Sequence, residues 1–255
     1  MSVVRKRDLG LAAIKFLQNA PIVEAIIDVR VEARPEFQGQ DFLAVMDGLR
    51  ADYPKAEARR GITLQAAFGG PQAQPEVQDH GVNGLFLRSD DEKLVAQFRT
   101  DGFTFNRLAP YTSWDQIAPR AMDLFKIYLD IALPKSVLRV ATRYINRLSF
   151  PSYRFDEYLT SPPRGIPGTS SPLGSFMEVT TSAEADGSTV QYTQVLDTAN
   201  SRPDASSVII DIDAFRVGEL EANVDTVRGY LSSLHELKNR VFFGALTESA
   251  VRLFE

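Results

Sequence analysis

Residues 21–32 read PIVEAIIDVRVE, and residues 137–148 read VLRVATRYINRL. In both stretches apolar and polar side chains alternate, so every second residue falls on the same side of an extended chain. A period of two is typical of a β-strand with one buried face. These two strands decide the fold, because a similar series of elements follows each of them.

The elements after each strand are predicted in the same order. After the first come a helix at 42–49, a strand at 61–68, a loop rich in Pro, Gln and Gly at 69–81, strands at 82–88, 94–99 and 103–108, and a helix from Ser113 to Pro134. After the second come a short helix at 155–159, strands at 175–184, 189–196 and 208–217, and a long helix from Asn223. Ser113 and Gln116 match a capping box at the helix start. We therefore predict an α+β protein built from two β-α-β-β-β-α units.

The two units would occupy residues 19–135 and 136–255, after an N-terminal extension at 1–18. Each unit would lay its helices on one face of an antiparallel sheet and leave the other face open. Edge-to-edge joining of the sheets would hide two edges that otherwise invite aggregation. We expect a duplicated topology that resembles the saddle of TATA-binding-protein-like folds, and the alternative is a helix-grip sheet around a ligand. The stretch 161–175, SPPRGIPGTSSPLGS, predicts an irregular, flexible loop.

Composition limits the classes of function. The chain has 255 residues, 44% of them hydrophobic, and a formal net charge of -5. This charge opposes general nucleic-acid binding, because affinity for phosphates comes from clustered Lys and Arg. The absence of cysteine excludes disulfides and thiolate metal sites and fits a reducing, cytoplasmic compartment. No stretch reaches the ~18 apolar residues of a membrane helix, and Lys15 interrupts the apolar N-terminal run, so we expect neither a membrane span nor a secretion signal.

The polar face of the second leading strand carries the strongest candidate site. Arg139, Arg143 and Arg147 project from one side of it, about 13 Å apart at the rise of a strand. They predict a site for phosphate, carboxylate or another anion. The alternative is a charge ladder in which three acids of the first leading strand neutralise them: Glu24, Asp28 and Glu32. The pairing of opposite charges across strands favours the ladder.

A second candidate is aromatic. Phe103, Phe105 and Arg107 share one face of their strand, and Tyr111 and Trp114 follow closely. Rings beside arginines can stack flat ligands or bases, but aromatic residues more often pack in the core. The candidate ligand-binding residues are therefore Arg107, Arg139, Arg143, Arg147 and Tyr111.

Catalytic signals are weak. The chain has two histidines. His80 lies in the predicted loop, and His235 lies between the apolar and polar faces of the last helix. Asp211 and Asp213 alternate with apolar residues, which is typical of the solvent face of an edge strand. No metal-ligand spacing, phosphate loop or nucleophile elbow is present. We predict no metal and no cofactor. The enzyme question stays open: the weak catalytic signals favour a non-enzymatic protein, and the alternative is an enzyme that acts on a small anionic substrate.

Three stretches together resemble a known family. They are NAPIVEAI at 19–26, FTFNRLAPY at 103–111 and RYINR at 143–147. As a set they are similar to a sporadically distributed family of uncharacterised prokaryotic proteins of about this length. The resemblance implies no activity, substrate or catalytic residue.

The sequence thus predicts a binding or interaction protein that holds an anionic ligand or a protein partner on its open sheet face. Nucleic-acid binding through the saddle is a further alternative. The C-terminal helix is unusually apolar near its end, which predicts that it either docks on its own sheet or forms a homodimer. Its apolar residues are Val241, Phe242, Phe243, Leu246, Val251, Leu253 and Phe254.

Overall fold

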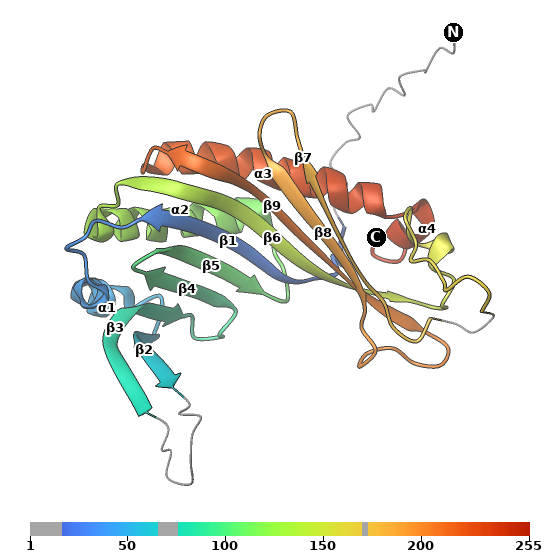
Figure 1. Cartoon of the computed structure of the whole chain (residues 1–255), viewed down its shortest axis with the longest axis horizontal. Coiled ribbons are helices and arrows are strands. Elements are labelled where there is room, and N and C mark those ends of the chain that lie inside the picture. Colours follow the sequence, from blue (N-terminus) through green and yellow to red (C-terminus); the bar gives the residue numbers. More distant parts are fainter. Residues whose placement is uncertain (1–16, 66–75, 170–172) are drawn as a thin grey trace.

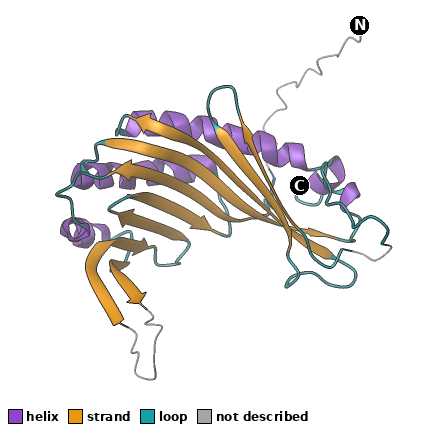
Figure 2. Ribbon diagram, in the orientation of Figure 1, coloured by secondary structure: helices purple, strands orange, loops and turns teal. Residues whose placement is uncertain are grey.

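The computed structural model of the chain describes residues 17–65, 76–169 and 173–255. Within these residues nine strands form one antiparallel sheet, and helices pack on one of its two sides (Figures 1 and 2). The α+β class and the large antiparallel sheet are therefore confirmed. Residues 1–16, most of the predicted N-terminal extension, lie outside the described part of the chain.

The bounds of the elements agree with most of the predicted ones. The strands are β1 (Ile22–Glu32), β2 (Lys55–Gln65), β3 (Glu76–Arg88), β4 (Leu94–Arg99), β5 (Gly102–Leu108), β6 (Ser136–Phe150), β7 (Met177–Ala183), β8 (Thr189–Leu196) and β9 (Ser206–Leu220). The helices are the 3-10 turns η1 (Gly39–Phe42) and η2 (Phe155–Glu157) and the α-helices α1 (Leu43–Leu49), α2 (Trp114–Ala132), α3 (Val224–Ala245) and α4 (Glu248–Val251). None of the described helices is both apolar enough and long enough to cross a membrane.

The sheet order is β2-β3-β4-β5-β1-β6-β9-β8-β7. The two leading strands, β1 and β6, are therefore neighbours at the middle of the sheet, with Ile27 opposite Thr142 and Arg30 opposite Arg139. The strand before α2, β5, flanks β1, and the strand before α3, β9, flanks β6. The strands up to α2 thus lie on one side of this central pair, and those that follow lie on the other.

The core lies between the sheet and the two long helices. Phe103 and Phe105 of β5 are fully buried there, as the packing interpretation of their strand predicts. Phe103 packs on Phe125 and Tyr128 of α2, with ring centroids 5.6 and 6.1 Å apart. Full burial of each such side chain stabilises the fold by about 1.5–3 kcal/mol. The core therefore fixes which face of β5 points toward the helices.

Three local predictions need correction. The strand predicted at 61–68 already begins at Lys55, because β2 spans Lys55–Gln65. The loop predicted at 69–81 is too long, because β3 already begins at Glu76 and pairs with the end of β2. Residues 66–75 of that stretch lie outside the described part. In β6, Leu138 was expected on the core face, but it is 40% exposed and Val137 is buried. An irregularity between Val137 and Arg139 in the pairing with β9 moves the alternation by one residue there.

The C-terminal segment packs largely within its own chain. The α3 helix starts at Asn223, whose side-chain oxygen accepts the backbone N–H of Thr226 at 2.8 Å, and it ends at Ala245. Phe242, Leu246 and Val251 are buried. The end of this helix therefore docks on its own chain, which is the first of the two predicted alternatives.

Candidate functional site

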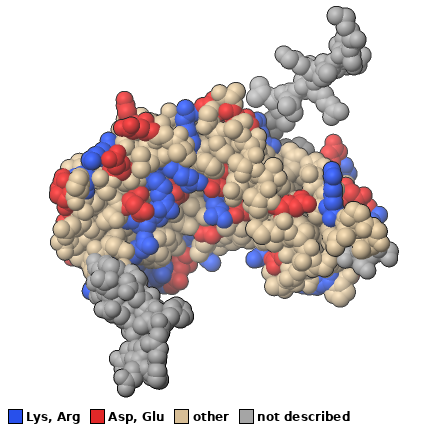
Figure 3. All heavy atoms as spheres, in the orientation of Figure 1, with Lys and Arg blue, Asp and Glu red and all other residues tan. Residues whose placement is uncertain are grey.

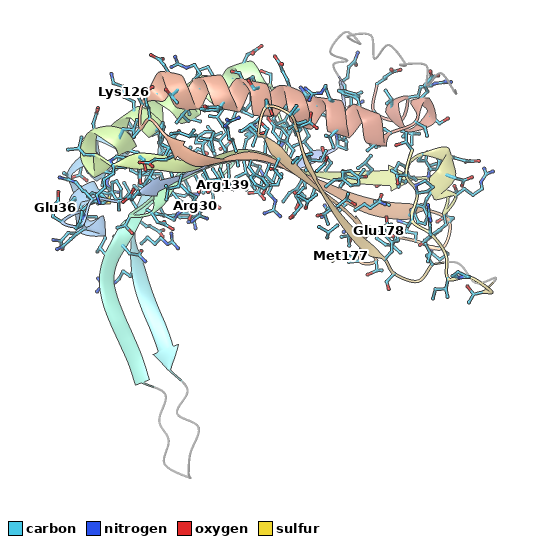
Figure 4. All side chains as sticks on the ribbon, turned by 45° about the horizontal axis from the view of Figure 1, so that its top comes forward. Arg30, Glu36, Lys126, Arg139, Met177 and Glu178 are labelled. Atoms are coloured by element: carbon cyan, nitrogen blue, oxygen red, sulfur yellow. The ribbon has the colours of Figure 1, made fainter. Side chains whose placement is uncertain are left out.

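One side of the sheet carries no helix, and this open face is concave. In Figure 4 the sheet arches beneath α3, and the labelled Arg30 and Arg139 lie close together on the side away from the helix. Their backbones are directly paired across β1 and β6. Figure 3 shows basic and acidic side chains interleaved over the middle of the visible surface. This face contains the polar side chains of both leading strands.

Strand pairing aligns a row of arginines and glycines across six strands of the open face. In order they are Arg59 (β2), Gly84 (β3), Arg99 (β4), Gly102 (β5), Arg30 (β1) and Arg139 (β6). Directly paired residues of antiparallel strands project to the same side of the sheet. At about 4.8 Å between strands, the row spans about 24 Å. We call Arg59, Arg99, Arg30 and Arg139 the arginine row.

The two glycines of this row are required by close backbone contacts. A Cβ atom at Gly84 would lie 2.1 Å from the carbonyl oxygen of Phe98, and one at Gly102 would lie 2.2 Å from that of Val29. Neither position has room for a side chain. The glycines therefore leave space between the arginines, and the long guanidinium groups occupy the surface above them.

Asp28 holds the inner part of the arginine row together. Its carboxylate accepts hydrogen bonds from Arg30 Nε at 3.2 Å, Arg99 Nη2 at 3.2 Å, Arg139 Nη1 at 3.1 Å and Thr104 Oγ1 at 3.0 Å. The Asp28 side chain is 15% exposed. Charge-assisted hydrogen bonds from three strands to one half-buried carboxylate hold the arginine side chains in fixed positions.

Two more carboxylates complete this network. Asp101 pairs with Arg30 at 2.9 Å and with Arg99 at 3.1 Å, and Asp213 pairs with Arg139 at 2.7 Å. Burial opposes ionisation of Asp101, but Arg99 and Arg30 together hold its pKa below the ordinary value. For Asp213 burial wins over Arg139 and raises the pKa. The inner three arginines therefore share three acids.

Arg59, at the outer end of the row, differs from the others. It is exposed, and no described carboxylate lies within ion-pair distance of it. It borders a hollow of about 340 Å³ that also contains the inner arginines Arg30 and Arg99. The other residues that line this hollow are Asn83, Gln97, Thr100 and Asp101. Arg30 and Arg99 share the carboxylates of Asp28 and Asp101, and Arg59 adds a third guanidinium group, so the described residues give the hollow an excess of positive charge.

The three arginines predicted on β6 are paired with acids. Arg143 binds Asp211 through Nε at 2.9 Å, Arg147 binds Asp197 through Nε at 3.0 Å, and Arg139 binds Asp28 and Asp213. The charge ladder thus exists, but most of its acids come from β9 and the end of β8. Of the acids predicted on β1, Glu24 instead accepts from Asn106 and Glu32 from Lys135 and Ser136.

Two expectations about this face are wrong. Asp211 and Asp213 are not on an edge strand, because β9 lies between β6 and β8. Arg107 does not join the candidate ligand-binding residues Arg143 and Arg147, because it is paired with Ala25 on the helix side of the sheet. Its Nε and Nη2 atoms donate to the carbonyl oxygen of Pro110 at 3.1 and 2.9 Å.

Tyr111 also lies on the helix side, where it joins a buried polar cluster. Its hydroxyl is 3.3 Å from that of Tyr144, which is 3.3 Å from His235 Nδ1. Trp114 stacks on His235 with ring centroids 4.2 Å apart. Burial, with a smaller contribution from the Lys238 ammonium group, lowers the pKa of His235 to about 3. The imidazole is therefore neutral at neutral pH.

Lys238 is a buried residue that sequence reasoning missed. It is 5% exposed, its Nζ lies 3.6 Å from the ring centroid of Tyr144, and no described carboxylate pairs with it. Burial lowers its pKa to about 7. A signal existed in the sequence, because Leu231, Leu234 and Lys238 recur at helical spacing on the apolar side of α3. None of the residues of this cluster lines the hollow beside Arg59.

The predicted flexible loop borders the second hollow. Residues 161–169 are irregular, and the segment 170–172 lies outside the described residues. A hollow of about 330 Å³ lies there, lined by Tyr153, Phe155, Asp156, Pro162, Pro163 and Leu173. Its lining has no basic side chain, so it does not suit an anion.

Across residues 17–65, 76–169 and 173–255, no group of three or more His, Asp or Glu side chains is placed to hold a metal ion. In comparisons with known proteins, no protein-family model matches the chain, and no curated protein is significantly similar to it.

Proposed function

We propose that the protein is a non-enzymatic binding protein whose open sheet face holds an anionic ligand at the Arg59 end of the arginine row. The observation that carries this proposal is the hollow that Arg59, Arg30 and Arg99 line together with Asp101, with Arg59 as the guanidinium group that no described carboxylate pairs. Guanidinium groups bind phosphate and carboxylate through paired, planar hydrogen bonds. Arg59 has no acid to exchange for a ligand among the described residues, so it contributes its charge to binding.

The network around Asp28 supports this proposal because it arranges the site in advance. Arg30 and Arg99 are both held by Asp28 and by Asp101, on strands in the interior of the sheet. A ligand then meets guanidinium groups that have already lost their rotational freedom, which lowers the entropic cost of binding. The volume of about 340 Å³ is at the lower end of ordinary ligand sites and suits a small anion or a phosphorylated group.

The alternative function is an enzyme that acts on a small anionic substrate. Such an enzyme needs a proton acceptor in the hollow, with a pKa near the working pH. Asp101 is the carboxylate that lines it, and its pKa lies below the ordinary value despite burial, because of Arg99 and Arg30. A carboxylate of this kind is a weak base. This observation favours binding over catalysis.

The sheet order supports a duplicated architecture, which we propose together with the likeness to TATA-binding-protein-like folds. In each half the leading strand is central, the strand before the long helix flanks it, and two further strands follow outward. The first half carries one extra outer strand, β2. We also propose the resemblance to the family of uncharacterised prokaryotic proteins, a cytoplasmic location and the binding of a protein partner.

The net charge of -5 counts against nucleic acid as the ligand.

The test is calorimetric titration of the full chain with inorganic phosphate, pyrophosphate and citrate at low ionic strength. We expect pyrophosphate to bind and the Arg59→Ala variant to lose about tenfold in affinity, since a charged hydrogen bond contributes roughly 1.5–3 kcal/mol. Arg154→Ala is the matched control, because that arginine is 72% exposed and pairs with Glu157 away from the hollow. Absence of binding for all three anions, or equal loss in both variants, refutes the proposal.

A further inference from the structure

The β7 strand forms one end of the sheet, and among the described residues its outer edge has no partner. It pairs with β8 on one side, from Met177 opposite Val195 to Ala183 opposite Thr189. All seven of its residues are exposed. An edge strand leaves a row of backbone N–H and C=O groups that can pair with another chain.

The two edges of the sheet differ in how they are protected. The opposite edge strand, β2, carries four charged side chains, Lys55, Glu57, Arg59 and Arg60, and its pairing with β3 is irregular near the arginines. Charges and bulges of this kind prevent edge-to-edge association. The β7 strand, with the sequence MEVTTSA, has one charge, no proline, no glycine and a regular register with β8.

We propose that β7 pairs in antiparallel fashion with the β7 strand of a second copy of this chain, around a two-fold axis at Thr180. In this register Met177 lies opposite Ala183 of the partner subunit, and Val179 lies opposite Thr181 of the partner subunit. The two sheets then continue into one another. A two-fold arrangement is closed, so it yields a dimer instead of a fibre.

The charges of the strand fit this register. The one charged residue, Glu178, lies opposite Ser182 of the partner subunit, so the two copies of Glu178 do not face each other. Glu178 is also occupied within its own chain, where it accepts a hydrogen bond from Gln194 Nε2 at 2.6 Å. Like charges directly opposite each other destabilise a strand pair, and this register avoids them.

The exposed apolar side chains fit the same register. Met177 and Val179 are 69% and 53% exposed. Met177 is paired with Val195 of β8, which is paired with Ile209 of β9. Val179 is paired in the same way with Thr193 and then Asp211. Paired residues share a side of the sheet, so Met177 and Val179 lie on the open face with Asp211. Together with Thr181 and Ala183 they make the open side of the strand uncharged. Pairing covers these side chains, which are otherwise in water, and adds the cross-strand contacts that stabilise sheets.

This dimer differs in location from a dimer through the C-terminal helix. It also leaves the Arg59 end of each arginine row open, because β2 and β7 are at opposite ends of the sheet. The inference therefore stands or falls independently of anion binding.

The test measures the mass of the full chain by sedimentation equilibrium over a dilution series, with two designed variants. Val179→Lys with Thr181→Lys places lysines opposite each other in the proposed register and should give a monomer. Val179→Lys with Thr181→Glu places opposite charges there and should restore the dimer. Both variants change exposed side chains only, and far-ultraviolet circular dichroism checks that they fold.

Four results overturn the proposal. The unchanged chain could sediment as a monomer throughout the series. The double-lysine variant could dimerise as well as the unchanged chain, which would place the interface elsewhere. The oppositely charged variant could remain monomeric while folded, which would refute the register. The Leu253→Asp variant changes a residue at the exposed end of the C-terminal segment, so it should leave the dimer intact. Loss of the dimer in this variant would also contradict pairing through β7.

Discussion

Asp28 of β1 accepts a hydrogen bond from Arg139 of β6 at 3.1 Å, across the pair of strands where the two halves of the sheet meet. The same carboxylate binds Arg99 and Arg30. One acid therefore connects four strands of the open face, which are β4, β1 and β6 through its arginines and β5 through Thr104. It both stabilises the sheet and limits the positive charge available to a ligand.

Replacement of Asp28 by Asn should change stability and anion binding in opposite directions. Three arginines lose the carboxylate that they share, so we expect the free energy of unfolding to fall by about 2 kcal/mol. The same change frees positive charge in the arginine row, so the affinity for pyrophosphate should rise. Urea unfolding and calorimetric titration of one preparation measure both effects.

The control is Asp225→Asn, which removes a carboxylate that is 91% exposed and pairs with Arg228 within α3. A surface pair of this kind contributes little, so neither stability nor anion binding should change appreciably. Unchanged pyrophosphate binding in the Asp28→Asn variant would show that the arginine row is not the binding surface.

Replacement of Lys238 by Met should stabilise the protein, most of all at low pH. Burial lowers the pKa of Lys238 from 10.5 to about 7, so between these values the unfolded chain binds more protons and stability rises with pH. Met removes this cost at similar volume and gives up a cation–π contact with Tyr144. We expect a gain of roughly 1–3 kcal/mol near pH 6 that shrinks toward pH 10.

Urea unfolding at several pH values measures this gain. Lys126→Met on the exposed side of α2 is the matched control (Figure 4). It should show no comparable gain and no such dependence on pH. A gain from Lys238→Met that is equal at about pH 6 and pH 10 would contradict the burial of an uncompensated ammonium group.

The fluorescence of Trp114 should report the protonation of His235. The chain has one tryptophan, and its ring is stacked on the imidazole at 4.2 Å. Because the pKa of His235 is lowered to about 3, the emission should stay constant down to about pH 4. The unfolded chain binds this proton near pH 6.5, so folding free energy is lost as the pH falls from 6.5 toward 3. An emission change centred near pH 6.5 in the folded protein would show that the imidazole is exposed.

Replacement of Gly84 by Ala should destabilise the sheet beneath the arginine row. Its Cβ atom would lie 2.1 Å from the carbonyl oxygen of Phe98, so β3 and β4 must separate, at a cost of about 1–3 kcal/mol. Gly229→Ala is the control, because nothing lies within 4 Å of a Cβ atom there and the site is inside α3. That change should stabilise by up to about 1 kcal/mol. Thermal unfolding compares them, and equal effects would refute the close strand contact.

Much of the architecture follows from local patterns, because alternation along a strand depends only on neighbouring residues. The faces of β1 and most of β6 were predictable in this way, and so was the helix-side position of Arg107, which shares its face with Phe103. The shift at Leu138 depends on an irregularity in pairing with a distant strand. Its position cannot be derived from local periodicity.

The site depends still more on distant pairing. Arg59, Arg99 and Arg30 are on three strands that are separated by glycine-containing neighbours, and only the register aligns them. The sequence predicted that arginines lie on the open face, and this is the case. It pointed to the arginines of β6 because they recur within one strand. Those arginines are paired with acids that come from β1, β9 and the end of β8. Local sequence does not show which charged side chains pair, because strand pairing in the tertiary structure decides it. The sequence therefore pointed to the paired arginines of β6 and not to Arg59.

The most direct test of the central claim is a titration of the nitrogen-15-labelled full chain with inorganic pyrophosphate, followed by amide and arginine Nε resonances. Anion binding at the arginine row predicts saturable shifts at the amides of Gly84 and Gly102 and at the Nε groups of Arg59, Arg99 and Arg30. Unshifted resonances at these positions, or shifts confined to residues 161–169 and α3, would contradict it.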